Sequence, residues 1–227
     1  MRKEQALSAK RRRKVASKLA SIAKANYGEL KRRKVRPSLD QLVQSILWHN
    51  ASVRRGTRAF RELKRAFVDW NEVRVSPVAE VAGAISSARW AMLCAESIRR
   101  VLWNLFETRN VVSLDFLKDM STAQARACLQ ELPGVSRDLA DEILLFSLGA
   151  DLLPTSEGAA RMCYRLGLTA SDRATLQNQK VLMEFWAPEL YPATTLFFID
   201  YANSACRENK PRHKDYPLNA VCPQKGT

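Results

Sequence analysis

Apolar residues recur every three or four positions along most of the 227-residue chain, which is the spacing of one buried face of an α-helix. No segment shows the alternation of apolar and polar positions, bounded by turn residues, that is typical of a β-strand. The pattern therefore predicts an all-α protein. The expected helices cover residues 13–28, 38–47, 53–67, 87–107, 113–120, 121–131, 136–148, 158–166, 171–186 and 191–205.

Three details of this pattern concern how helices begin and which face they bury. Ser38-Leu39-Asp40-Gln41 has the form of a capping box, in which Ser38 would precede the first helical residue. Ser76-Pro77 predicts another helix start, since proline suits the first helical position. The helix over 87–107 would bury one apolar face. The expected members of that face are Trp90, Leu93, Ile98, Val101, Leu102 and Leu105.

The turn between the helices expected over 121–131 and 136–148 is the most informative stretch. It consists of Leu132, Pro133, Gly134, Val135, Ser136 and Arg137. Pro133 cannot extend the first helix, Gly134 accepts backbone angles that other residues resist, and Ser136 can cap the second helix. Such an αα-hairpin leaves backbone N–H groups pointing outward at a helix N-terminus, where a phosphate group binds readily.

Positive charge is concentrated near the N-terminus. Residues 1–38 carry a net charge of +12, whereas the whole chain carries +14, so the remainder is nearly neutral. The dense runs are Lys10–Lys14 and Lys31–Lys34. Such an arm could simply aid solubility, but beside the hairpin we favour phosphate binding driven by counterion release. The residues expected to contact DNA are Arg11, Arg12, Arg13 and Lys14, within a flexible basic arm over residues 1–14.

Other features of the composition narrow the class of protein. The chain has no run of about 18 apolar residues, and its basic N-terminus lacks the apolar stretch of a secretory signal. We therefore expect no membrane partner, and a cytoplasmic monomer associated with the nucleoid. Five cysteines occur without a CxxC pair, and Cys94, Cys128 and Cys163 are expected to be core residues.

The segment from Leu132 to Leu168 resembles the endonuclease III family of helix-hairpin-helix DNA glycosylases. Its sequence, LPGVSRDLADEILLFSLGADLLPTSEGAARMCYRLGL, is similar to the family block LPGVGRKTA…VDTHVxRVxxRLGL without a gap. Arg161 and the Arg165–Leu168 tetrapeptide fall in register. The similarity extends over roughly residues 13–222.

The resemblance implies a two-lobed all-α fold. One lobe would be a six-helix-type domain over 38–150 that contains the hairpin. The other would combine 15–37 with 151–227. In the family, duplex DNA lies across the cleft between the lobes, held mainly by its phosphates, and the damaged nucleotide is flipped out of the stack.

The family's catalytic positions are altered in this sequence. Bifunctional members use a lysine directly after the hairpin turn to form a Schiff base with the sugar. Asp138 stands at that position, and a carboxylate cannot form a Schiff base. Monofunctional members keep an aspartate further on that stabilises the cationic sugar. Ser156 occupies that position, and Gly158 replaces a family histidine.

Two substitutes for the missing acid are conceivable. A one-residue shift would give Glu157 the aspartate's role, or Asp138 could act across the cleft. The simpler interpretation is that Asp138 interacts with its helix dipole and that Glu157 is a surface carboxylate. We favour the simpler interpretation for both, because catalysis tolerates about 1 Å of misplacement poorly.

The family often carries a four-iron cluster held by cysteines near the C-terminus. At the matching spacings this chain has Cys206, His213, Tyr216 and Cys222. Iron–sulfur clusters are held mainly by cysteine thiolates. We therefore expect no cluster, no other metal and no other cofactor.

Asn50 matches a family glutamine that fills the gap left by the flipped base. Its side chain has the same donors and acceptor, although it is shorter. An equally good interpretation is a cap at the end of the preceding helix.

The leading functional hypothesis is a DNA-binding protein of this fold, related to base-excision repair, that lacks glycosylase and lyase chemistry. The alternatives are a divergent glycosylase that uses Glu157 or Asp138, and a protein-interaction module built on the same scaffold.

Overall fold

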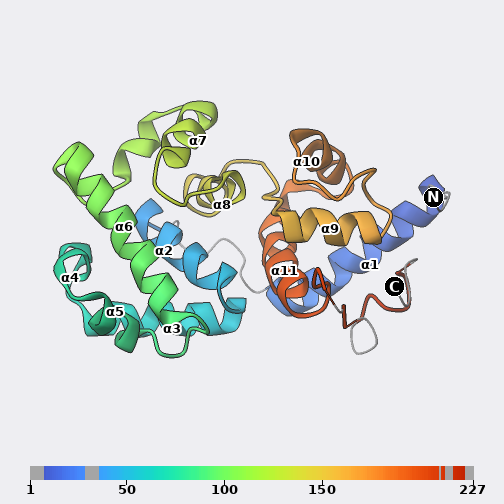
Figure 1. Cartoon of the computed structure of the whole chain (residues 1–227). Helices are drawn as coiled ribbons and strands as arrows, with labels where there is room; N and C mark the ends of the chain where they lie inside the picture. The colour runs from blue at the N-terminus through green and yellow to red at the C-terminus, as the bar shows by residue number, and fades with distance from the viewer. Residues whose placement is uncertain (1–7, 29–35, 210, 213–216, 223–227) are drawn as a thin grey trace. The chain divides into compact units, whose positions relative to one another are not determined.

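The computed structural model describes residues 8–28, 36–209, 211–212 and 217–222. All regular structure in these residues is helical, so the all-α prediction is confirmed (Figure 1). Two compact units divide the chain: Arg33–Ala150 forms one, and Met1–Arg32 with Asp151–Thr227 forms the other. None of the described helices is both long and apolar enough to cross a membrane.

The unit Arg33–Ala150 is built around a buried helix, α2. The α-helices of this unit are α2 (Ser38–His49), α3 (Val53–Ala66), α4 (Trp70–Val75), α5 (Val78–Ala84), α6 (Ala91–Arg109), α7 (Thr122–Gln130) and α8 (Arg137–Leu148), with a 3₁₀ turn η2 (Asp115–Asp119). Ten of the twelve α2 residues are buried, because α3, α6 and α8 all pack against it. The buried residues of α2 include four polar ones, Ser38, Gln41, Gln44 and Ser45, beside six apolar ones.

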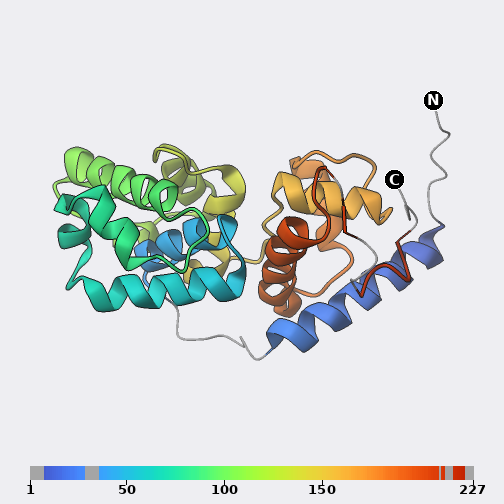
Figure 2. The ribbon, with the colours of Figure 1, turned by 60° about the horizontal axis from the view of Figure 1, so that its bottom comes forward.

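The second unit joins the N-terminal helix to the C-terminal third. It contains α1 (Ala9–Tyr27), α9 (Glu157–Arg165), α10 (Leu176–Met183), α11 (Tyr191–Ser204) and the 3₁₀ turn η3 (Pro188–Leu190). Figure 2 shows α1 and α11 side by side; the α1 face that is buried carries Val15, Ala16, Leu19 and Ala23. Trp186 Nε1 donates to Ala16 O at 3.0 Å, which ties the segment after α10 to α1.

The N-terminal arm differs from the prediction. Ser8 caps α1 and residues 9–14 form its first turns, so the expected flexible arm is wrong for these residues. Residues 1–7 and the Lys31–Lys34 run lie outside the described residues.

Several helix details also differ. Pro37, whose backbone is extended, takes the N-cap of α2, so Ser38 is the first helical residue and the capping box does not form. The prediction did not include the short helix α4. Trp90 precedes α6, and Leu93 lies about 100° from the buried Cys94–Ile98 line, so both are about half exposed. Helix α10 begins five residues late because Thr175 caps it.

Candidate functional site

The hairpin turn is anchored by two apolar side chains. Leu132 and Val135 are buried, and Val135 N donates to Leu132 O at 3.1 Å. Between them Gly134 has a φ of +79°, a conformation that other residues rarely adopt. Gly134 and Ser136 are exposed, so the turn presents its backbone to solvent at the start of α8.

The sequence predicted that the Ser136 side chain caps α8, and this prediction is wrong. Ser136 occupies the N-cap position, but its hydroxyl donates to the Asp138 carboxylate. The N-terminus of α8 therefore lacks the usual hydroxyl acceptor for its first N–H groups. The first turn of α8 therefore combines N–H groups that no serine oxygen occupies with the negative charge of Asp138.

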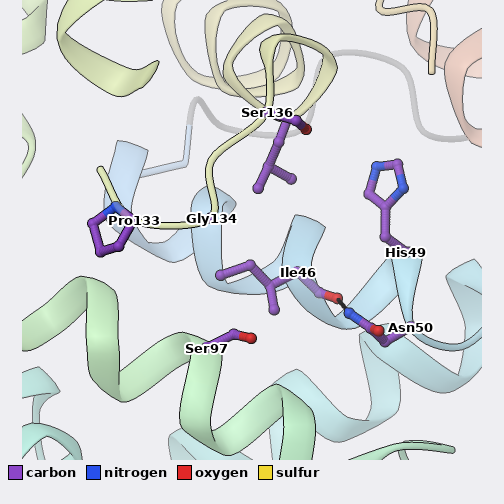
Figure 3. A pocket seen from close by; sticks show the side chains of 8 residues that line it. Ile46, His49, Asn50, Ser97, Pro133, Gly134 and Ser136 are labelled. Atoms are coloured by element: carbon purple, nitrogen blue, oxygen red, sulfur yellow. Dashed lines mark hydrogen bonds between the residues drawn. The ribbon is translucent and has the colours of Figure 1, made fainter. Parts of the chain in front are cut away.

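A pocket of about 220 Å³ lies beside the hairpin turn (Figure 3). It is formed by the end of α2, by α6, by the turn itself and by the start of α8. The lining residues are Ile46, His49, Asn50, Ser97, Pro133, Gly134, Ser136 and Leu139.

Asn50 lies at the pocket and serves as the C-cap residue of α2. Its Nδ2 donates to Ile46 O at 2.9 Å, a bond that Figure 3 shows. The side chain is thus folded back on its own helix. The capping interpretation describes this conformation, and a role in binding DNA stays a prediction.

His49 and Glu142 form an ion pair at the pocket. His49 Nε2 lies 2.6 Å from Glu142 Oε1, and the Glu142 side chain is only 2% exposed. Burial alone would lower the pKa of His49, but the Glu142 charge and hydrogen bond, with a contribution from Asp138, raise it to about 9. The imidazole is therefore a cation at neutral pH, at the negative end of α2.

A second buried carboxylate, Asp141, supports the hairpin from inside. Its oxygens lie 2.5 Å from Arg126 Nε and 3.9 Å from Arg137 Nε. Asp141 therefore connects α7 to the first residue of α8. Sequence reasoning missed both Asp141 and Glu142, although adjacent acids on the apolar face of an expected helix indicate buried charges with partners.

Asp138 and Ser156, which the sequence comparison predicts to replace catalytic residues, have local structural partners and lie in different units. Asp138 accepts from Ser136 in the unit Arg33–Ala150. In the other unit, Ser156 is the N-cap of α9 and accepts from Ala159 N at 3.2 Å. Glu157 is exposed and accepts from Ala174 N at 3.2 Å. Gly158 is also structural, because a Cβ there would lie 2.9 Å from Ala202 Cβ of α11.

The four cations expected to bind DNA near the N-terminus are not equivalent. Arg12 is half-buried, its Nη2 donates to Leu168 O at 2.8 Å, and its guanidinium lies over the Phe185 ring. Arg12 therefore holds α1 to its own unit. Arg11, Arg13 and Lys14 are exposed on α1.

Two of the four residues that the sequence comparison places at cluster positions lie within the described part of the chain. Cys206 and Cys222 are buried, and both contact Arg165. Arg165 donates to Cys206 Sγ and to Arg207 O, and Cys222 Sγ donates to Arg165 O. His213 and Tyr216 lie outside the described residues. A set of two cysteines, one histidine and one tyrosine is a poor match for an iron–sulfur cluster, because such clusters are held mainly by cysteine thiolates with histidine as an occasional substitute. Within the described part of the chain, no three His, Cys, Asp or Glu side chains are grouped to hold a metal ion.

Comparison with known proteins identifies the fold. The structure matches a non-covalent endonuclease III–DNA complex with a TM-score of 0.63 at 17% identity, covering 93% of this chain and 95% of that one. It matches a thermostable thymine-DNA glycosylase with a TM-score of 0.61 at 15% identity, covering 94% and 96%. The chain thus has the endonuclease III-like DNA glycosylase fold, and the resemblance found in the sequence is confirmed at this level.

Sequence relatives are plant proteins. The DNA glycosylase/AP lyase ROS1 of Arabidopsis thaliana is 24% identical over 193 residues, which cover 78% of this chain and 14% of that protein. Protein ROS1A of Oryza sativa subsp. japonica is 22% identical over 200 residues, which cover 81% and 10%. This chain therefore spans only a small part of these relatives. No protein-family model matches it.

Proposed function

We propose that the chain is a DNA-binding protein related to base-excision repair that binds the phosphates of duplex DNA and lacks the standard glycosylase and AP-lyase reactions. The observation that carries this proposal is the hairpin. Its turn is anchored by Leu132 and Val135, its backbone is exposed at Gly134, and Asp138 stands where the lyase reaction needs an amine.

The chemistry of the two substituted positions supports a loss of activity. Schiff-base formation requires an uncharged amine that attacks the sugar C1′. Asp138 has a carboxylate instead, and this carboxylate accepts a hydrogen bond from Ser136. Stabilising a cationic sugar requires a negative charge close by, and Ser156 offers a neutral hydroxyl that caps α9. The proposal includes no iron–sulfur cluster, since the ligand set is a poor match for one.

A matched pair of glycine variants tests the role of the hairpin. Gly134 and Gly149 both have positive φ, at opposite ends of α8, and an added Cβ would contact nothing within 4 Å at either position. Gly134→Ala and Gly149→Ala should therefore strain the backbone to a similar extent, about 1 kcal/mol. We expect only Gly134→Ala to weaken binding to an undamaged duplex, about tenfold, in a fluorescence-anisotropy titration at low salt.

Two results would contradict the proposal. If wild-type protein does not bind duplex DNA at low salt, the proposed DNA-binding function is wrong. If the two variants lose affinity equally, the hairpin has no particular role in binding. Release of a base from a panel of damaged duplexes would establish the alternative, a divergent glycosylase.

The alternative of a divergent glycosylase can be tested at Glu157. Glu157 is an exposed carboxylate adjacent in sequence to the substituted Ser156, and its contact with Ala174 N leaves it accessible to solvent. If wild-type protein releases bases, Glu157→Gln and Asp138→Asn variants will show which carboxylate is required.

A further inference from the structure

Helix α3 carries an unusual concentration of exposed positive charge. Its fourteen residues include six cations and one acid, Glu62. The cations are Arg54, Arg55, Arg58, Arg61, Lys64 and Arg65, and all six are exposed. The hairpin and the N-terminal helix described above do not include this surface.

Four of these arginines form a straight stripe. Successive residues of an α-helix are about 100° apart, so Arg54, Arg58, Arg61 and Arg65 lie within about 60° of one another around the axis. The buried residues Val53, Gly56, Ala59 and Leu63 lie on the opposite side. The packing of α3 therefore fixes the stripe toward solvent over a length of about 16 Å.

Most of the stripe has no neutralising partner. Arg58 pairs with Glu62 at 2.9 Å, and Glu62 also accepts from Ser87. Among the described residues, no carboxylate lies within ion-pair distance of Arg54, Arg61 or Arg65. Exposed faces that serve only solubility usually mix both signs of charge, whereas this stripe is of one sign.

We infer that the stripe of Arg54, Arg58, Arg61 and Arg65 is a second contact surface for the sugar–phosphate backbone of duplex DNA. A length of about 16 Å corresponds to roughly five base pairs at 3.4 Å each. A stiff duplex presents phosphates along that length, and each arginine that neutralises one releases a condensed counterion. The inference rests on the DNA-binding function proposed above.

The position of α3 makes this contact distinct from the hairpin. Helix α2 packs against both α3 and α8, and the stripe faces away from α2. Arg54 follows Asn50 of the hairpin pocket by only four residues, so the stripe starts near the pocket in sequence and extends away from it.

A membrane surface fits this face less well than DNA. Amphipathic helices that bind membranes insert an apolar face into the lipid, together with a basic polar face. In α3 the apolar face is already buried against the rest of its unit. The exposed residues of α3 are its six cations and Ala66, so no large apolar side chain of this helix is fully exposed to solvent.

The test is the salt dependence of DNA binding. A triple variant, Arg54→Gln, Arg61→Gln and Arg65→Gln, removes the unpaired cations and keeps good helix-forming residues. The slope of log K against log salt becomes shallower by about 0.9 for each phosphate that the protein no longer neutralises. We expect the variant's slope to be shallower by about 2 to 3, with an unchanged melting temperature.

The control variant removes three exposed cations elsewhere, by Lys118→Gln, Arg173→Gln and Lys180→Gln. We expect its slope to change by less than about one. The inference would be overturned if the slope changed equally in both variants or stayed unchanged in the α3 variant. It would also be overturned if the protein bound vesicles of anionic lipid in place of DNA and this binding required the stripe. If wild-type protein does not bind DNA at all, the proposed function fails and the inference fails with it. Wild-type binding with an unchanged α3 slope would overturn the inference alone.

Discussion

His49 is the residue whose charge state is set most clearly by its surroundings. Its pKa is raised to about 9 by the buried Glu142 carboxylate, against an ordinary value near 6.5. A group with a raised folded-state pKa adds stability that is complete below its unfolded pKa and is lost as pH rises through its folded pKa. His49 should therefore stabilise the fold below about pH 6.5 and contribute little above pH 9.

Urea unfolding between pH 6 and 10 checks this prediction. We expect the free energy of unfolding to fall by on the order of 2–3 kcal/mol across that range through His49. His49→Gln should flatten this part of the profile and should be destabilised at low pH, since Glu142 then keeps a buried charge without a cation. The control is His213→Gln, a change in the chain's other histidine. An unchanged profile in His49→Gln would contradict the assignment.

Individual site residues could be predicted from the sequence only where spacing determined them. Asp138 and Ser156 were assigned to the catalytic positions because the matched block has no gap, and that assignment stays a prediction. For Arg12 the DNA contact stays a prediction, and its contacts with Leu168 and Phe185 could not be predicted because these residues are more than 150 positions away in the chain. Glu142 was missed because a buried acid is recognised by its partner, His49, which lies on another helix.

At the scale of elements, the spacing of apolar residues predicted where most of the longer helices lie but did not predict where they begin and end. The expected range for α8 is within one residue of the observed one. Helix α4 has only six residues, too few for an apolar period to show. The start of α2 shifted because proline took the N-cap in place of Ser38. Tertiary packing and local caps determine such boundaries more than propensity does.

Helices α2 and α3 approach closely at Gly56. A Cβ on Gly56 would lie 2.8 Å from the backbone of Leu47 and Trp48, and backbone atoms cannot move aside as a flexible side chain can. Gly56→Ala should therefore separate the two helices and lower the free energy of unfolding by about 1–3 kcal/mol. Thermal or urea unfolding followed by circular dichroism measures the change.

Gly83 in α5 is the matched control for this variant. It is also helical, but an added Cβ would contact nothing within 4 Å. Gly83→Ala should raise stability by about 0.5–1 kcal/mol, because alanine favours the helix and restricts the unfolded chain. Destabilisation of equal size in both variants would contradict this assignment, because helix propensity favours alanine at both positions and an added Cβ meets the α2 backbone only at Gly56.

At the scale of the whole molecule, net charge concealed how the cations are distributed. The sequence after residue 38 is nearly neutral in sum, which suggested a neutral body with a basic arm. The fold places a strongly cationic α3 within that body and uses Arg12 of the arm for packing. A sum over sequence cannot reveal which charges share a face, since that depends on helix orientation.

The proposed loss of lyase chemistry can be tested by placing an amine at position 138. Asp138→Lys places a lysine directly after the hairpin turn, as in the bifunctional family members that the sequence resembles. Because Asp138 is close enough to influence the pKa of His49, the new lysine would stand near an imidazolium. A neighbouring cation lowers a lysine's pKa and increases the fraction of nucleophilic amine.

We expect Asp138→Lys to form a borohydride-trapped covalent adduct with DNA that contains an abasic site, whereas wild-type protein forms none. Asp138→Arg is the matched control, because it introduces the same charge and cannot form a Schiff base under these conditions. Trapping by wild-type protein would contradict the proposed loss of lyase chemistry. If Asp138→Lys binds the DNA tightly but is not trapped, the hairpin does not bring position 138 to the sugar, and this chain binds DNA in a different register from the enzymes whose fold it shares.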